Sequence, residues 1–187
     1  ACRVAIAMQR RCDELQEEFK RLGARDGLYM RVGVSTGPMV VGNMGSSQRF
    51  SYTVLGDAVN YASRLEGANK FFGTRILLAQ TTAELVKDKL PTRKLDYIRV
   101  KGRKGAEFIF ELLLTDDSKS TQFAHAYEKA WSLYRERKWD AAEHSLLEIL
   151  TNFGDDFMSK ALLERVRSYR QAPPADDWDG SYNLSEK

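Results

Sequence analysis

Two side chains four residues apart, Asn60 and Arg64, have types and a spacing that could do chemistry together. In a helix this spacing places both on the same face, one turn apart. An amide and a guanidinium presented together near the start of a helix can stabilise an anion, and the helix dipole adds to that effect. The pair also has an ordinary interpretation, because an asparagine and an arginine at this spacing on a surface helix commonly have no function.

The pair is positioned by a strand that leads into a helix. Phe50, Tyr52 and Val54 alternate as in a strand, which ends at Gly56-Asp57. We expect Asp57 to be the helix N-cap, because its carboxylate can accept hydrogen bonds from the N–H groups that open a helix. Apolar residues on a different side of this helix are expected to pack against a sheet: Val59, Ala62 and Leu65.

The chain before this strand predicts a helix and the first arm of a hairpin. Apolar residues at steps of three and four, among them Val4 and Met8, predict one amphipathic helix over residues 1–22. Residues 28–35 are expected to form a strand that continues over 38–43 after a break. The turn-forming residues GNMGSSQR come next, so this strand and the one that follows are expected to make a β-hairpin.

The string RFSYTVLGDAVNYASRLE, at residues 49–66, resembles the catalytic domain of class III nucleotidyl cyclases. In that family the pattern GDAVN-x-ASRLE follows a strand of the preceding hairpin. The segment RVGVSTGPMVVGNMG, at 31–45, also matches, and the separated matches stand in the family's order. The resemblance covers residues 1–114 and implies an α+β, ferredoxin-like cyclase catalytic domain that lacks its first strands here. We therefore expect the chain to be cut from a longer protein.

The resemblance implies roles for four residues. Arg64 would stabilise the charge that develops on the α-phosphate, and Asn60 would orient the ribose oxygen. Lys101, in the family's VKG motif, would reach the triphosphate, although a solvated basic hairpin tip is the alternative interpretation. Thr53, seven residues before Asn60, stands where the family reads the purine edge. A hydroxyl can accept a hydrogen bond from the adenine amine, so we expect ATP rather than GTP as substrate, with a guanylate cyclase as the alternative.

The reaction implied is attack of the ribose 3′-hydroxyl on the α-phosphorus, with pyrophosphate leaving. Charge grows on the equatorial oxygens, so the site needs cations and donors aimed at them. Two Mg²⁺ or Mn²⁺ ions are expected in the intact enzyme. The family holds them with two aspartates on strands that precede this segment, so no metal ligand is assigned in this chain. Pro38 replaces a phosphate-binding arginine of some cyclases; Arg49 could serve instead or be structural.

Cyclase sites of this family form between two antiparallel catalytic domains. One domain contributes the metal carboxylates, and the other contributes the base-reading and transition-state residues. We therefore expect a homodimer with two equivalent sites, and expect this chain alone to be inactive because its residues are all of the second sort. An upstream sensory domain, in a parent protein that could be membrane-anchored, would control how the two domains meet.

The remaining elements of the first 114 residues are strands and a helix. Residues 75–78 predict a short buried strand, and 80–90 predict a helix capped by Thr81 or Thr82. Two further strands are expected at 94–100 and 107–114.

Residues 115–187 differ in character and are expected to form a small α-helical appendage. After a polar linker, helices are predicted at 123–136, 139–151 and 157–170, and the first two resemble one tetratricopeptide unit. An acidic tail is expected to stay extended, with Trp178 as its anchor. This appendage suggests docking or dimer support, and a peptide-docking scaffold is therefore one alternative function. A cyclase-like module that only dimerises or regulates is another.

The composition argues against two kinds of partner. A net charge of +3, spread along the chain, argues against nucleic acid and permits a phosphate-bearing ligand. Cys2 and Cys12 fall on different sides of one predicted helix and cannot pair, which favours a reducing, cytoplasmic environment. No apolar run approaches the roughly 20 residues needed to span a bilayer.

Overall fold

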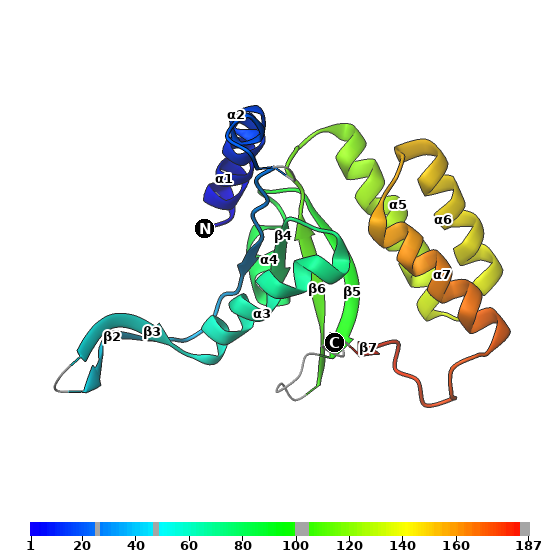
Figure 1. The fold of residues 1–187 in the computed structure, drawn as a ribbon. Helices are drawn as coiled ribbons and strands as arrows, with labels where there is room; N and C mark the ends of the chain where they lie inside the picture. Colours follow the sequence, from blue (N-terminus) through cyan, green and yellow to red (C-terminus); the bar gives the residue numbers. More distant parts are fainter. Residues whose placement is uncertain (25–26, 47–48, 100–104, 184–187) are drawn as a thin grey trace. The chain divides into compact units, whose positions relative to one another are not determined.

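A computed structural model describes residues 1–24, 27–46, 49–99 and 105–183 of the chain (Figure 1). The chain divides into unit 1, Ala1–Val86, and unit 2, Lys87–Lys187, which are described separately. Across the described residues, no helix combines the length and the apolarity that crossing a membrane requires.

Unit 1 begins with two helices where one was predicted. The helices α1 (Cys2–Glu14) and α2 (Gln16–Arg21) meet at Leu15, whose backbone stays close to helical. The prediction of which face of the helix is buried is wrong. Val4 and Met8, which were expected to be buried, are 60% and 46% exposed. The buried face is instead made of Cys2, Ala5, Ile6 and Gln9.

Strand β1 (Val32–Val34) is shorter than the predicted strand over 28–35. Two glutamines of the N-terminal helices bind the backbone that precedes it. The Gln9 amide donates to the Met30 carbonyl (2.8 Å), and the Gln16 side chain both accepts from the Leu28 N–H and donates to its carbonyl. These hydrogen bonds replace the ladder bonds that a longer strand would need. β1 pairs in parallel with β4 (Ile76–Ala79), whose four residues are all buried.

The predicted hairpin is confirmed. Strands β2 (Val40–Ser46) and β3 (Arg49–Leu55) pair antiparallel in a two-stranded sheet of their own. The sequence predicted that the strand over 28–35 would continue over 38–43, but β2 lies in a different sheet from β1. In Figure 1 the hairpin projects from the rest of unit 1. Its apolar side chains are accordingly exposed: Met39, Val40, Val41, Tyr52, Val54 and Leu55.

Two predicted helix caps in unit 1 are wrong. Helix α3 (Asp57–Phe72) has Gly56 as its N-cap, and Asp57 is its first helical residue. Helix α4 (Gln80–Val86) follows β4 directly, so Thr81 and Thr82 lie inside it. Both threonines bind the segment after β1 instead. The Thr81 hydroxyl donates to the Thr36 carbonyl, and the Thr82 hydroxyl lies 2.9 Å from that of Thr36.

Unit 2 combines a β-ribbon with three helices. Strands β5 (Thr92–Arg99) and β6 (Ala106–Leu112) pair antiparallel, and the short strand β7 (Tyr182–Asn183) pairs in parallel with β5. The helices are α5 (Ser118–Arg135), α6 (Trp139–Phe153) and α7 (Phe157–Gln171). α5 begins inside the predicted linker, because the Asp117 carboxylate accepts from the Ser120 N–H (2.7 Å) and caps the helix. The residues buried on α5 and α6 include Tyr127, Ala130, Trp131, Tyr134, Ala142, Leu146 and Ile149.

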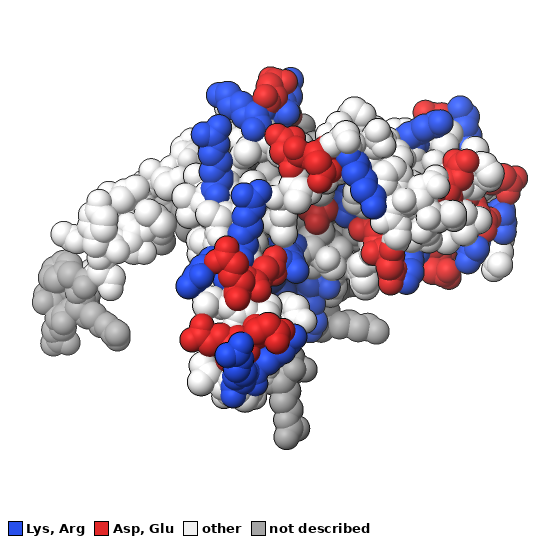
Figure 2. All heavy atoms as spheres, turned by 90° about the horizontal axis from the view of Figure 1, so that it is seen from above, with Lys and Arg blue, Asp and Glu red and all other residues white. Residues whose placement is uncertain are grey.

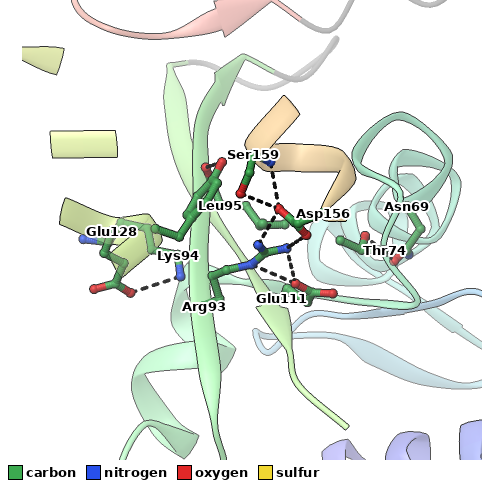
Figure 3. Close-up of polar contacts among 10 residues, drawn as sticks. Asn69, Thr74, Arg93, Lys94, Leu95, Glu111, Glu128, Asp156 and Ser159 are labelled. Atoms are coloured by element: carbon green, nitrogen blue, oxygen red, sulfur yellow. Dashed lines mark hydrogen bonds and ion pairs between the residues drawn. The ribbon is translucent and has the colours of Figure 1, made fainter. Parts of the chain in front are cut away.

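A buried ionic cluster joins the ribbon of unit 2 to its helices (Figure 3). The Arg93 side chain is 2% exposed and pairs with Glu111 (2.6 Å) and Asp156 (2.9 Å). Its guanidinium also lies over the rings of Phe123 and Tyr127 at 4.5 and 4.7 Å. Burial acts to raise the pKa of Asp156, but the Arg93 charge and the hydrogen bonds from Arg93 and Ser159 together outweigh it, so this pKa lies below its ordinary value. The Arg93 side chain, on β5, therefore contacts residues of β6 and α5 and the residue that precedes α7.

A second buried pair makes a similar link. Asp96 is fully buried in β5, where its carboxylate accepts from Trp131 Nε1 (3.1 Å) and Arg165 Nη1 (2.8 Å). Trp131 therefore contacts the ribbon as well as lying in the helical core, and its ring packs edge-on against Phe108. The helices of unit 2 are continuous with the β5–β6 ribbon rather than separate from it.

Candidate active site

Helix α3 presents the predicted pair in the expected way. Asn60 and Arg64 are both exposed on it, while Tyr61 and Leu65, one position further on, are 2% and 1% exposed. The structure thus brings the amide and the guanidinium to one open face of a helix whose neighbouring face is packed.

The position of α3 is fixed by a close approach to β1. A Cβ atom at Gly33 would collide with the Ala62 carbonyl oxygen and the Glu66 nitrogen of the helix. Only glycine permits this approach, so the helix backbone lies directly on the strand. The consequence is a helix whose distance from β1 is set by backbone atoms rather than by flexible side chains.

Asn69 holds the other end of α3, and sequence reasoning missed it. Its buried amide donates to the Val32 carbonyl of β1 (3.0 Å) and to the Leu65 carbonyl within the helix (2.9 Å). The Thr74 hydroxyl donates to the Asn69 side-chain oxygen (2.9 Å), as Figure 3 shows. The available signal was an asparagine in a helix interior just before Gly73, which ends the helix in a left-handed conformation. Asn69 is a positioning residue for α3.

The start of α3 modifies the expected electrostatics. Asp57 is the first helical residue rather than the N-cap, and its negative charge lies in the first turn. A carboxylate there offsets part of the positive end of the helix dipole. Stabilisation of an anion by this helix therefore depends more on Arg64 than on the dipole.

Thr53 lies on β3, opposite Gly42 of β2. It is half-buried, and a Cβ atom at Gly42 would meet no heavy atom within 4 Å. The hairpin therefore leaves open space at Gly42, the residue paired with Thr53. Thr53 is on the strand that precedes α3 rather than on the helix that carries Asn60 and Arg64. Lys101 lies outside the described residues.

The described residues do not fit a metal centre. Within residues 1–24, 27–46, 49–99 and 105–183, no group of three or more histidine, cysteine, aspartate or glutamate side chains could hold an ion. Class III cyclases generally use divalent metal ions. The roles considered below for α3 and β3 therefore involve no metal ligand from this part of the chain.

The surface of the molecule shows no single field of one charge on the face drawn in Figure 2, where basic and acidic side chains are intermixed. The hairpin differs from this surface. Its strands, residues 40–46 and 49–55, include one charged residue, Arg49. A largely apolar hairpin followed by a helix with an exposed polar face is the local setting of the predicted site.

Comparisons with known proteins define the class. Residues 1–113 match the family model described as adenylate and guanylate cyclase catalytic domain, so the chain belongs to that family. The predicted family and the predicted α+β fold class are confirmed. The family includes both adenylate and guanylate cyclases, so membership leaves the purine base open.

Individual relatives agree with this assignment. Adenylate cyclase 1 of Rhizobium meliloti (strain 1021) is 38% identical over 113 residues, which cover 60% of this chain and 17% of that protein. The adenylate cyclase of Anabaena cylindrica is 33% identical over 118 residues, covering 60% of this chain and 24% of that protein. The crystal structure of the adenylyl cyclase CyaB from P. aeruginosa matches with a TM-score of 0.53 at 32% identity, over 60% of this chain and 56% of that chain. The chain thus spans only a small part of the curated relatives it matches.

Proposed function

We propose that this chain contributes one half of the active site of an adenylate cyclase, which forms 3′,5′-cyclic AMP and pyrophosphate from ATP. The observation that carries the proposal is the exposed pair Asn60 and Arg64 on one face of α3, in a chain of the cyclase family. The relatives described above that are named as adenylate cyclases support the choice of reaction.

The roles of the two residues follow from the reaction. As the 3′-oxygen attacks the α-phosphorus, negative charge grows on the phosphoryl oxygens. A guanidinium offers several N–H donors in one plane, which suits Arg64 to those oxygens. The Asn60 amide can donate to the ribose oxygen and hold it in line for attack. Both roles need a rigid helix, which the Gly33 contact and Asn69 provide.

Base recognition is assigned to Thr53. Its hydroxyl can accept from the adenine 6-amino group, and the open space beside Gly42 would admit a base edge. Lys101 is proposed to contact the triphosphate on the strength of its place in the motif alone. Cytoplasmic location and an upstream sensory domain remain predictions.

A homodimer would complete the site. The exposed apolar side chains of the β2–β3 hairpin, such as Tyr52 at 76% and Val40 at 66% exposure, support this because a second copy would remove them from water. The Mg²⁺ or Mn²⁺ ions expected in the enzyme would then be held outside the residues described here. Chain 1–187 by itself is expected to be inactive.

The proposal is tested with Arg64→Ala in a full-length protein that contains this chain. Loss of the guanidinium should lower kcat for cyclic AMP formation by on the order of 10²-fold or more, because it removes a donor aimed at the transition state. The matched control is Lys70→Ala, another exposed basic residue of α3. Equal, small effects of the two substitutions would remove Arg64 from the site.

Base choice is tested separately by Thr53→Ala. The wild-type protein should turn over ATP in preference to GTP, and the substitution should reduce this preference by about tenfold, the value of one hydrogen bond to the base. The measurement is kcat/KM for both nucleotides. Equal turnover of ATP and GTP by the unchanged protein would contradict the role of Thr53.

A further inference from the structure

The C-terminal tail, residues 172–183, lies on unit 2 instead of extending freely. After α7 ends at Gln171, the tail passes the corner between α5 and α6 and then pairs with β5 through β7. Its contacts are of three kinds: an aromatic anchor, hydrogen bonds to its backbone, and strand addition. Together these are the means by which proteins bind extended peptides.

The anchor is Trp178. Its ring packs edge-on against Tyr134 of α5 (centroids 5.3 Å apart) and Tyr169 of α7 (5.5 Å), and it lies 6.3 Å from Trp139 of α6. All three helices of the unit therefore contribute to one aromatic pocket. The pocket is completed by Arg137, whose guanidinium lies 5.8 Å from the Trp178 ring.

Two arginines bind the tail through its backbone. Arg137 donates to the carbonyls of Ala175 (2.7 Å) and Asp176 (3.2 Å), and Arg135 donates to the Asp179 carbonyl (2.7 Å). Arg137 has a positive φ of 59°, the only non-glycine residue of the described chain in that conformation. This conformation ends helix α5, because the Lys138 N–H donates to the Leu133 carbonyl (3.0 Å) and the Arg137 N–H to the Tyr134 carbonyl (3.1 Å). Contacts to carbonyls are largely independent of the side chains of the bound segment.

The end of the tail is bound by charge and by β-pairing. Tyr182 and Asn183 pair with Ile98 and Arg99 at the edge of β5. Arg99 also forms an ion pair with Asp179 and donates to the Ser181 hydroxyl. The Arg165 guanidinium lies 4.0 Å from the centre of the Tyr182 ring. Four arginines, Arg99, Arg135, Arg137 and Arg165, thus surround a segment of sequence ADDWDGSYN.

The tail is bound less completely than the helical core. The ion pair of Arg99 with Asp179 is about half-exposed on both sides, Tyr182 is 40% exposed, and β7 has only two residues. Among the described residues the indole N–H of Trp178 is buried without a hydrogen-bond partner. Exposed ion pairs contribute little, and an unsatisfied buried donor weakens binding. The tail therefore has the character of a bound ligand rather than of a core element.

We propose that this surface of α5, α6, α7 and the β5 edge is a peptide-docking site that residues 172–183 occupy in the unbound protein. Its partner is an extended acidic peptide with a tryptophan between aspartates, as in the tail itself. Arg99 and Arg137, which pair with the Asp179 and Asp176 carboxylates, supply the charge complementarity, and the aromatic pocket supplies the anchor. Because the tail is covalently attached, a partner must compete with its high effective concentration, so docking is restrained until the partner is abundant.

The test uses a fluorescent peptide of residues 175–183 and fluorescence anisotropy, without any nucleotide. A chain ending at Gln171 should bind this peptide, and the full chain should bind it at least tenfold more weakly because its own tail competes. The same peptide with Trp178→Ala should not bind the shortened chain. Arg137→Ala in the shortened chain should weaken binding about tenfold, whereas Arg167→Ala, which alters an arginine paired with Glu143 and Glu164, should not.

Binding of the peptide with equal affinity by the full and shortened chains would overturn the proposal. So would no binding by a shortened chain whose circular dichroism and cooperative unfolding match those of the full chain. If the shortened chain does not fold, the full chain carrying Trp178→Ala decides. It should bind the unaltered peptide more tightly than the wild-type chain does, and failure to do so would show that the tail is part of the core. None of these readouts depends on cyclase activity.

Discussion

Apolar side chains are exposed along the hairpin of unit 1, whereas the helices of unit 2 bury most of theirs, with Leu147 and Phe157 as exceptions. Tyr52 and Leu55 are 76% and 58% exposed, while Tyr127, Leu146 and Val166 are fully buried. A unit that covers its own apolar surface needs no partner for stability. An exposed apolar hairpin is typical of a surface that association covers. The comparison therefore supports the proposed association through the hairpin of unit 1, and it shows that unit 2 buries most of its apolar surface within itself.

The two units also differ in how they use polar groups in the interior. Unit 1 fixes α3 with the neutral amide of Asn69, which is 1% exposed. Unit 2 buries charge, with Arg93 between two carboxylates and Asp96 beside Arg165. Removing one partner of a buried ion pair leaves an uncompensated charge, which is strongly destabilising. Unit 2 should thus be sensitive to single charge changes in a way that unit 1 is not.

The largest effect is expected for Arg93→Met. This change leaves Glu111 and Asp156 without their counter-charge and should lower the free energy of unfolding by about 3–5 kcal/mol. The measurement is denaturant unfolding of the chain at neutral pH. Arg167→Met is the control, because its ion pairs lie at the surface, and its effect should be far smaller. Similar losses for both variants would end the distinction between buried and surface charge in unit 2.

A smaller effect, on association alone, is expected for Tyr52→Ser in the hairpin. If a second copy covers Tyr52, its loss should raise the dimer dissociation constant about tenfold, or ~1.4 kcal/mol. The free energy of unfolding should stay unchanged, because the ring is exposed within the chain. Sedimentation equilibrium of the full-length protein measures the constant. Tyr29→Ser is the matched control, since Tyr29 is 79% exposed and lies outside the hairpin. The same weakening from both would contradict a specific role of the hairpin.

Local patterns in the sequence were sufficient to predict most elements. The helix carrying Asn60 and Arg64, the hairpin before it and the three C-terminal helices all follow from apolar spacing and turn residues. The face on which Asn60 and Arg64 lie also follows, because it depends only on the helical repeat. What this face binds was inferred from the family motif rather than from the pattern.

Features that depend on contacts between distant residues could not be predicted. Gln9 and Gln16 bind backbone groups of residues 28–30, and this shortens β1. Arg93 lies before the strand predicted at 94–100, and its part in the buried cluster depends on Asp156, which is far along the chain. No periodicity signals such partners, because a buried polar side chain is identified only by what surrounds it.

The division into domains illustrates the same limit. Sequence composition and the family match both place a boundary near residue 114, whereas the compact units divide between Val86 and Lys87. The β5–β6 ribbon belongs to the cyclase match by sequence and packs with the helices of unit 2 through Arg93 and Asp96. The division at residues 114 and 115 therefore stays a prediction.

The central claim is that Arg64 of one molecule acts in a site shared with a second molecule. The most direct test mixes a full-length protein carrying Arg64→Ala with an excess of chain 1–187, which supplies an intact Arg64. Mixed dimers are isolated by a different tag on each partner. They should form cyclic AMP at least tenfold faster than the Arg64→Ala homodimer. The recovery cannot exceed the loss caused by that substitution, which is on the order of 10²-fold. Chain 1–187 that itself carries Arg64→Ala should give no recovery. Isolated mixed dimers that remain as inactive with the intact chain as with the altered one would contradict the claim.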